Sequence, residues 1–273
     1  NFGPTLLSWM KDADPDTYKR ILDADADSRA RLGKGNAIAQ AYNHMILPLA
    51  TEAERRTQIR WGIEDFRHRF GRQPEGMWLP ETAADLDTLR DLEREGIQFT
   101  VLSPYQAARV RPLGSGQPWR DVGDGSIDPS RAYRCWLDAE RTRSIALFFY
   151  DGPVSQAISF QGVLREARTF QERLVQAWSP ARRHAQLVNV ATDGETYGHH
   201  QRFGDLTIAF ALHRSLEKEG FTLTNYAAFL GAHPPEWEVE IKSGPDGLGT
   251  AWSCAHGTLR WHEDCGCTTG AQH

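Results

Sequence analysis

Short apolar runs alternate with stripes of apolar residues at helical spacing along most of the chain. The stripe that follows Thr51-Glu-Ala-Glu54, a segment with the spacing of a helix capping box, predicts a helix that ends near Gly71. The apolar run 76–79 predicts a strand, and the leucines that follow it predict a helix that ends near Gly96. This part of the chain therefore reads as helix, strand, turn and helix.

The same alternation continues toward the C-terminus. Apolar runs predict strands over 97–102, 144–150 and 185–191, and apolar stripes predict helices over 155–178 and 204–218. Strands that alternate with helices are typical of a parallel sheet covered by helices, either a barrel or a doubly wound sheet. We therefore expect an α/β fold.

Two segments lack this pattern. Residues 104–143 are rich in Gly, Pro, Asp and Arg, which predicts one long loop that acts as a lid or a binding loop. The tail 234–273 contains tryptophans but no helical period, so we expect irregular structure there. The 273 residues are expected to form a single domain.

Composition narrows the classes of function. Hydrophobic residues make up 40% of the chain and charged residues 25%, and no apolar run approaches the roughly 20 residues that a membrane-spanning helix needs. The net charge of -5 leaves no excess of positive charge to neutralise phosphates, so we expect neither a membrane span nor a nucleic-acid partner. Nine tryptophans and seven tyrosines supply rings that can stack on sugars, although core packing accounts for most of them.

The chain has four cysteines and no signal-peptide pattern, which favours a reduced, cytoplasmic protein. It begins at Asn1 with sequence typical of the middle of a globular protein, and we expect it to be a fragment of a longer chain. Three cysteines crowd the tail, as Cys254-x-His256 and Cys265-x-Cys267. These residue types suit a structural zinc ion, but the spacings are not those of common zinc fingers, so we expect buried reduced thiols and no metal or cofactor.

Three carboxylates follow predicted strands: Glu81, Asp151 and Asp193. Loops at the carboxyl ends of parallel strands converge at one face of a sheet, where partial burial raises a carboxyl pKa. When two carboxyl groups lie close together their pKa values move apart, so one can act as an ionised nucleophile while the other donates a proton. Two structural interpretations compete: Glu81 can favour the dipole of the following helix, and Asp193-Gly194 can form a turn.

The segment Asp193-Gly-Glu-Thr-Tyr-Gly-His-His200 also suggests a metal site, because Asp and His are common ligands of divalent ions. Adjacent histidines point in different directions on most backbones, so at most one of His199 and His200 would face the same site as Asp193. We therefore favour acid/base chemistry over metal binding, and His200 is expected to continue the turn. His44 lies in an apolar setting, where a histidine is more often a core residue than a ligand.

Two separated stretches are Asn43-His-Met-Ile-Leu-Pro48 and Gly76-Met-Trp-Leu-Pro-Glu-Thr82. Together with the segment that begins at Asp193, they resemble regions of glycoside hydrolase family 57. The first is similar to a His-containing region of the family, and the second is similar to the region that carries the nucleophile. Asp193-Gly-Glu-Thr-Tyr-Gly-His199 resembles the region whose first aspartate is the general acid/base. Trp252-Ser-Cys-Ala-His-Gly257 with Asp264-Cys-Gly-Cys267 looks like a subgroup with a cysteine-rich C-terminal stretch.

The resemblance implies an incomplete, seven-stranded TIM-like (β/α) barrel that acts on α-glucans. No stretch matches the His-Gln-Pro type motif of the family's first strand, so that strand is expected to be missing from this chain. The implied reaction is retaining: Glu81 forms a covalent glycosyl-enzyme and Asp193 is the general acid/base, with Glu195 holding Asp193 or Tyr197. The residues expected to contact or support the sugar substrate are His44, Trp78, Asp151, Glu195, Tyr197, His199 and Trp252.

Two other functions stay open. A metal-dependent carbohydrate deacetylase uses a related incomplete barrel with Asp and His ligands, although the chain has no His-x-x-x-His pair. A non-catalytic glucan-binding barrel fragment would bind an oligosaccharide or polysaccharide without turnover. Amylase, branching and 4-α-glucanotransferase activities differ in how water and acceptor sugars compete for one intermediate, so the sequence does not separate them, and it predicts no oligomeric state.

Overall fold

The computed structural model describes residues 1–267, which belong to two compact units. Unit 1 comprises residues 1–127, 132–148 and the chain from 226 onward, and unit 2 comprises residues 128–131 and 149–225. Unit 1 carries the sheets, and unit 2 is largely helical. The single domain expected from the sequence stays a prediction.

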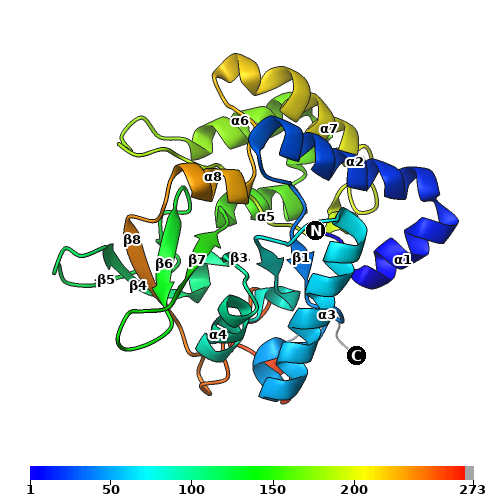
Figure 1. The fold of residues 1–273 in the computed structure, drawn as a ribbon. Helices are drawn as coiled ribbons and strands as arrows, with labels where there is room; N and C mark the ends of the chain where they lie inside the picture. The colour runs from blue at the N-terminus through cyan, green and yellow to red at the C-terminus, as the bar shows by residue number, and fades with distance from the viewer. Residues whose placement is uncertain (268–273) are drawn as a thin grey trace. The chain divides into compact units, whose positions relative to one another are not determined.

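Unit 1 begins with two helices and then mixes short strands with helices (Figure 1). Its helices are α1 (Pro4–Ala13), α2 (Pro15–Leu32), α3 (Glu52–Phe70), α4 (Leu86–Arg94) and α8 (Tyr226–Ala232). Its strands are β1 (Ala39–Gln40), β2 (Met77–Trp78), β3 (Phe99–Leu102), β4 (Ala107–Pro112), β5 (Arg120–Asp121), β6 (Ala132–Trp136), β7 (Ser144–Phe149) and β8 (Trp237–Ile241). The predicted capping box at the start of α3 is present, with Thr51 and Glu54 bonded reciprocally through side chain and backbone.

Two sheets form in unit 1. β1 and β2 pair in parallel, with Ala39 opposite Met77. The second sheet has the strand order β3-β7-β6-β8-β4-β5; its pairs β6–β7, β4–β8 and β4–β5 are antiparallel, and β6–β8 is parallel. A parallel bridge joins Gly76, the residue before β2, to Phe99, the first residue of β3. The result is an α/β fold in which the described residues form mixed sheets, not a closed barrel and not the purely parallel sheet that alternation predicted.

The segment 104–143 is not the single long loop that its composition predicted. It contains β4, β5 and β6. The arginines of this segment had suggested a loop, but at least one forms an ion pair across neighbouring strands. Arg111 on β4 lies 2.6 Å from the buried Glu238 on β8, measured from Nε to Oε1. The tail likewise contains β8 at Trp237–Ile241, where irregular structure was expected.

Unit 2 is built from α5 (Gly152–Phe160), α6 (Ala167–Ala177) and α7 (Gly204–Phe210). A single helix was predicted over 155–178, but the chain breaks between α5 and α6 at Gly162, whose φ of 68° lies in the left-handed region. The helices enclose an apolar core made of Val154, Ile158, Leu164, Phe170, Leu174, Ala211 and Leu216.

The run 185–191, also in unit 2, was predicted to be a strand and is not one in the structure. Its backbone groups bond to separate points instead of a ladder: the Leu187 N–H donates to Ser130 O, and the Asn189 carbonyl accepts from the Asp151 N–H, each at 2.9 Å. An apolar run predicts burial, but it does not say which groups the backbone pairs with.

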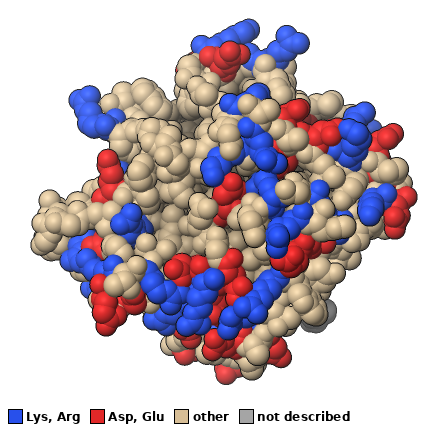
Figure 2. Space-filling model, viewed as in Figure 1, with Lys and Arg blue, Asp and Glu red and all other residues tan. Residues whose placement is uncertain are grey.

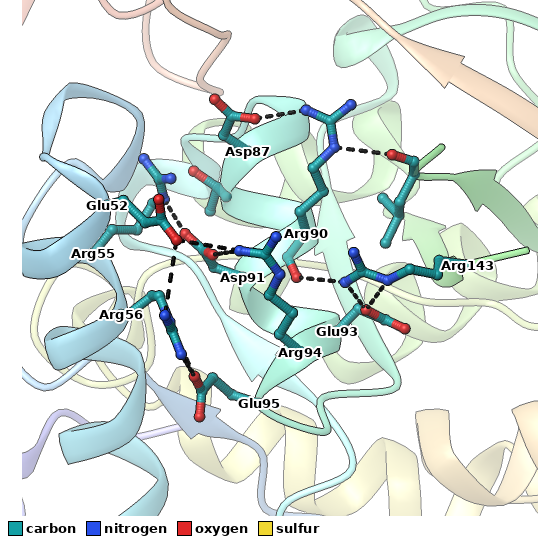
Figure 3. A network of polar contacts seen from close by, with 12 residues as sticks. Glu52, Arg55, Arg56, Asp87, Arg90, Asp91, Glu93, Arg94, Glu95 and Arg143 are labelled. Carbon is teal, nitrogen blue, oxygen red and sulfur yellow. Dashed lines mark hydrogen bonds and ion pairs between the residues drawn. The ribbon is translucent and has the colours of Figure 1, made fainter. Parts of the chain in front are cut away.

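Ion pairs fix α3 against α4 in unit 1 (Figure 3). Arg55 on α3 and Asp91 on α4 are both buried, with 2.6 Å between Nε and Oδ2. Arg94 on α4 reaches back to Glu52 on α3 at 3.2 Å. Removal of one partner of a buried ion pair strongly destabilises a protein. This network therefore holds α3 and α4 together, the helices that precede and follow β2 in the sequence.

Acidic and basic side chains are intermixed on the face that carries α3 and α4 (Figure 2). Such a mixture is typical of a surface with many short ion pairs. A surface that binds the phosphate backbone of a nucleic acid has a continuous basic stripe instead. Among the helices of residues 1–267, none combines the length and the apolar character that crossing a bilayer requires.

Candidate active site

Glu81 lies in a tight turn directly after β2. The 3₁₀ turn Pro80–Thr82 has two non-glycine residues with left-handed backbone, Glu81 (φ 58°, ψ 17°) and Thr82 (φ 51°). Each such residue costs about 1–3 kcal/mol, and the strain persists only where surrounding contacts hold the backbone in place. The helix that follows is capped by Asp85, whose Oδ1 accepts from the Thr88 N–H at 2.7 Å, so Glu81 is not the residue that starts the helix.

Gln106 holds this turn from a fully buried position. Its Oε1 accepts hydrogen bonds from Thr82 Oγ1 at 2.8 Å and from the Ser103 N–H at 2.9 Å. Its Nε2 donates to Thr82 O at 2.8 Å and to Thr250 O at 3.1 Å. A two-way backbone bridge between Ala84 and Thr250 ties the same turn to the tail. The strained backbone is therefore fixed from several directions at once.

Three donors surround the carboxylate of Glu81. Oε2 accepts from Ser253 Oγ at 2.6 Å and from Trp252 Nε1 at 3.0 Å, and His44 Nε2 lies 3.4 Å from Oε1. Burial raises the pKa of Glu81, but the hydrogen bonds from these three donors outweigh burial and hold the pKa below its usual value. Glu81 is therefore ionised at neutral pH, the state that a nucleophile requires, and 26% of its side chain is exposed.

Two tryptophans flank this carboxylate. Trp78, the last residue of β2, meets Trp252 edge to face with ring centroids 5.2 Å apart and an interplanar angle of 70°. Both side chains are partly exposed, so each can offer an apolar face to a ligand. His44 has 63% of its side chain exposed, so it is not the core histidine that its neighbours suggested. Unit 1 thus brings together Glu81, His44, Trp78 and Trp252.

Asp193 begins a second turn, in unit 2. Its carbonyl accepts from the Thr196 N–H at 3.1 Å, and the 3₁₀ turn Gly194–Thr196 follows, as the Asp-Gly pair predicted. The side chains of Asp193, Glu195 and His199 are all exposed. This turn therefore presents two carboxylates and an imidazole to solvent within its own unit.

Tyr197 anchors that turn to the core of unit 2. Its ring packs against the apolar core, and its hydroxyl is hydrogen-bonded to Thr192 Oγ1. The expectation that Glu195 holds Asp193 or Tyr197 stays a prediction. Burial raises the pKa of Tyr197 more than the bond from Thr192 lowers it, so the phenol stays protonated at neutral pH. The Glu195 carbonyl accepts from the His200 N–H at 2.8 Å, and His200 thereby continues the turn.

Asp151 has a structural role in unit 2. Its Oδ1 accepts from the Val154 N–H at 2.9 Å and caps α5, and its own N–H donates to the Asn189 carbonyl. An N-cap accounts for an aspartate at this position without a ligand. A sugar contact from Asp151 stays a prediction.

The tail contains a group of four metal-ligating residues, the one such group of three or more in the part of the chain that the structure describes. The ligand atoms of Cys254, His256, Cys265 and Cys267 all lie within 4.8 Å of one another. Cys254 is buried but Cys267 is exposed, so the prediction of buried thiols is wrong for Cys267. Among residues 1–267 this group does not include Asp193, His199 or His200.

The family model of glycosyl hydrolase family 57 matches residues 6–242, which include both Glu81 and Asp193. The chain belongs to this family. None of the curated proteins matches it. The matched region ends before the four ligand residues of the tail, so the family match does not account for them.

Solved enzyme structures share the fold of this family 57 chain. The exo-type maltose-forming amylase from Pyrococcus sp. ST04 has a TM-score of 0.72 and 15% identity, over 95% of this chain and 43% of that chain. The family 57 type branching enzyme from Pyrococcus horikoshii has a TM-score of 0.65 and 18% identity, over 92% and 53% of the two chains. The 4-α-glucanotransferase from Thermococcus litoralis gives 0.60 and 18%, over 92% and 33%. The family 57 chain therefore spans about half of these structures or less.

Two residues of the candidate site were not predicted from the sequence. Ser253 donates the shortest of the bonds to Glu81, and its position beside Trp252 was the available signal. Gln106 lies in the segment that was expected to be a loop, and the capping-box spacing from Ser103 to Gln106 was the available signal. Contacts between segments that are distant in sequence do not appear in the spacing of residues along the chain.

A cavity of about 390 Å³ lies elsewhere in unit 1, lined by residues of α1, α2, α3 and β1, and Glu81 is not among its lining residues. Its lining is mostly apolar, with Asp65 as the carboxylate present, and Asp65 is paired with Arg69. We therefore place the site by its chemistry, at Glu81, and not by cavity volume.

Proposed function

We propose that this chain carries the catalytic centre of a retaining enzyme that acts on α-glucans, with Glu81 as the nucleophile and Asp193 as the general acid/base. The observation that carries the proposal is the Glu81 turn, where a strained backbone presents an ionised carboxylate beside partly exposed tryptophans. Family 57 membership and the amylase, branching enzyme and glucanotransferase among the similar structures support α-glucans as the substrate class.

The proposed reaction has two displacements. Glu81 attacks the anomeric carbon and the glycosidic bond breaks, while Asp193 gives its proton to the leaving oxygen. Asp193 then takes a proton from water or from an acceptor sugar, whose oxygen displaces Glu81 from the anomeric carbon. Two inversions give net retention, and the mechanism requires the two carboxyl groups to lie about 5–5.5 Å apart.

The hydrogen-bond donors around Glu81 support its proposed role as the nucleophile. Ser253 and Trp252 both bind Oε2, which leaves Oε1, the oxygen on the His44 side, to attack the sugar. Hydrogen bonds to the ionised form keep the carboxylate ready for attack and make it a better leaving group in the second displacement. His44 is placed to interact with a sugar hydroxyl beside the reacting bond.

The other residues proposed to contact the sugar are near Glu81 or Asp193 in the chain or in space, and most are at least partly exposed. Trp78 and Trp252 are proposed to form an apolar wall against a sugar ring. Glu195 and His199 are exposed and proposed to bind sugar hydroxyls next to Asp193, with Tyr197 as their anchor. Asp151 is proposed to contact sugar only through the part of its carboxylate that does not cap α5.

The test uses amylose, maltooligosaccharides and glycogen with the parent chain, Glu81→Gln and Asp193→Asn. We expect the parent chain to release or transfer sugars with retained anomeric configuration, and both variants to bind maltooligosaccharide without turnover. Undiminished turnover by either variant would contradict the assigned roles. Binding without turnover by the parent chain is the result expected of a glucan-binding module. Release of acetate from an added acetylated oligosaccharide, abolished by a chelator, is the result expected of a deacetylase.

A further inference from the structure

Four side chains of the tail converge on one point from two short segments. Cys254 and His256 come from the first segment, and Cys265 and Cys267 come from the second. We propose that these four residues bind one Zn²⁺ ion as a closed structural site, and that this ion holds the donors of the Glu81 carboxylate in place. The second part of the proposal rests on the proposed function, whereas the first does not.

The distances between the ligand atoms suit a tetrahedral ion. With Zn–S bonds of about 2.3 Å and tetrahedral angles, two thiolates lie about 3.8 Å apart. The sulfur of Cys254 lies 3.8 Å from the sulfur of Cys265 and 3.8 Å from that of Cys267. With a Zn–N bond of about 2.0–2.1 Å, a thiolate and an imidazole nitrogen lie about 3.6 Å apart. His256 Nδ1 lies 3.9 Å from Cys254 and 3.3 Å from Cys267, on either side of that value.

The same distances do not describe a disulfide. A disulfide needs about 2.0 Å between the sulfur atoms, well below the 3.8 Å that separates Cys254 from each of the other two cysteines. Three thiols also leave one unpaired in any disulfide scheme. Three thiolates and one imidazole are a known ligand set of structural zinc sites, in which the protein fills every position.

The local backbone allows each pair to face one point. Gly266, between Cys265 and Cys267, has a φ of 71°, and its N–H donates to Asp264 Oδ1 at 3.0 Å. This left-handed turn, which glycine adopts without strain, lets two cysteines separated by one residue present their sulfurs to the same side. The C-x-C spacing that is unusual for zinc fingers is thus compatible with a shared ligand.

The cluster is joined to the candidate active site through two residues. Trp252 and Ser253, which both donate to Glu81 Oε2, immediately precede Cys254 in the chain. Arg260, between the two ligand segments, donates to the Ser253 carbonyl at 2.7 Å. An ion that ties Cys254 to the second segment would therefore fix the backbone that carries these donors, which makes the four ligands positioning residues.

Metal content tests the zinc site without reference to activity. The chain is purified under reducing conditions from zinc-supplemented culture, together with Cys265→Ser, Cys267→Ser and the control Cys135→Ser. Burial raises the pKa of the Cys135 thiol to about 12, and Cys135 is not in the cluster, so its variant reports destabilisation by loss of a cysteine alone. We expect one zinc per parent chain and per Cys135→Ser chain, and loss of that zinc from the other two.

Cobalt gives a second readout. Titration of the metal-free parent chain with Co²⁺ should produce the visible bands of a tetrahedral thiolate site, and these bands should be absent in Cys265→Ser. Zinc-free parent protein that gives no such bands would overturn the proposal, and so would zinc content unchanged in both cluster variants.

The link to Glu81 has its own readout. If the ion positions Trp252 and Ser253, its loss in Cys267→Ser removes hydrogen bonds from Glu81, and the acid limb of the activity profile moves to higher pH, while Cys135→Ser leaves that limb unchanged. An unmoved limb in a variant that has lost its zinc would overturn the positioning role and leave the metal site standing. Retained zinc with no activity in the parent chain would instead contradict the proposed function.

Discussion

The Glu81 turn and the Asp193 turn are built in opposite ways. The Glu81 turn in unit 1 has two left-handed residues, a fully buried glutamine behind it and hydrogen bonds to its carboxylate. The Asp193 turn in unit 2 has an exposed carboxylate on one 3₁₀ turn, and it is anchored to its core by Tyr197. A nucleophile must meet one carbon atom, whereas an acid/base must pass a proton to and from changing partners, so the difference fits the two proposed roles.

The two proposed roles require opposite protonation states of the two carboxyl groups when the glycosidic bond breaks. Glu81 is kept ionised by donors within its own unit, which act in the absence of substrate. Asp193 is exposed in unit 2, and in its proposed role as general acid it must hold a proton when the glycosidic bond breaks.

The largest expected effect separates the two carboxylates by the leaving group. Asp193→Asn should lower kcat on maltooligosaccharides by about 10²–10⁴-fold, the usual contribution of general acid catalysis. On an aryl α-glucoside with an acidic phenol the first displacement needs no proton, so this variant should recover most of the rate of that step. Glu81→Gln should recover none, because no carboxylate is present to form the ester. Steady-state and burst kinetics on both substrates measure these rates. Equal recovery by the two variants would contradict the assignment of Glu81 as nucleophile and Asp193 as general acid/base.

The next effect concerns the support of the strained turn. Gln106→Leu removes the side-chain bonds to Thr82 and Thr250 and leaves buried polar groups unpaired, so we expect a loss of about 2–3 kcal/mol in unfolding free energy, together with reduced kcat. Gln171→Leu, at a glutamine bonded to Glu219 on the surface of unit 2, is the matched control and should change stability little. Urea unfolding of both variants decides the point; equal midpoints would show that the glutamine does not hold the turn.

A smaller effect is a shift in pH dependence. Ser253→Ala removes a donor to ionised Glu81, so the pKa of Glu81 rises and the acid limb of kcat/KM moves to higher pH. The same lowered pKa gives Glu81 a stabilising contribution that is present above its unfolded pKa and lost as the pH falls through its folded pKa. Ser115→Ala, at an exposed serine of unit 1, is the control. Activity profiles from acid to neutral pH measure the limb, and coincident profiles for parent and Ser253→Ala would remove this donor from the account.

The smallest effect is expected at Tyr197. Tyr197→Phe removes the hydroxyl bonded to Thr192 but keeps the ring in the core of unit 2, so we expect a loss of about 0.5–1.5 kcal/mol in stability and a modest rise in KM. Thermal unfolding and steady-state kinetics measure both. A fall in kcat as large as that of Asp193→Asn would mean that the phenol takes part in the chemistry, contrary to its role as an anchor.

Local patterns predicted well the elements that flank Glu81 in the chain, and they predicted two other segments poorly. The capping box of α3, the strand at β2 and the helix α4 follow from spacing alone, because each has one side facing a core. The run 185–191 and the segment 104–143 were misread, because the first makes scattered backbone bonds and the second pairs its arginines with distant glutamates. Gln106 and Ser253 depend on contacts between segments far apart in sequence, which one sequence does not reveal.

The central claim is that Glu81 becomes covalently attached to sugar. A 5-fluoro-α-glucosyl fluoride forms such an intermediate faster than it is hydrolysed, so incubation with the chain, digestion and peptide mass spectrometry locate the ester. The account predicts a glucosyl adduct on the peptide that contains Glu81, absent in Glu81→Gln and longer-lived in Asp193→Asn. An adduct on a different carboxylate, or turnover of α-glucan with inverted products and no adduct, would contradict it.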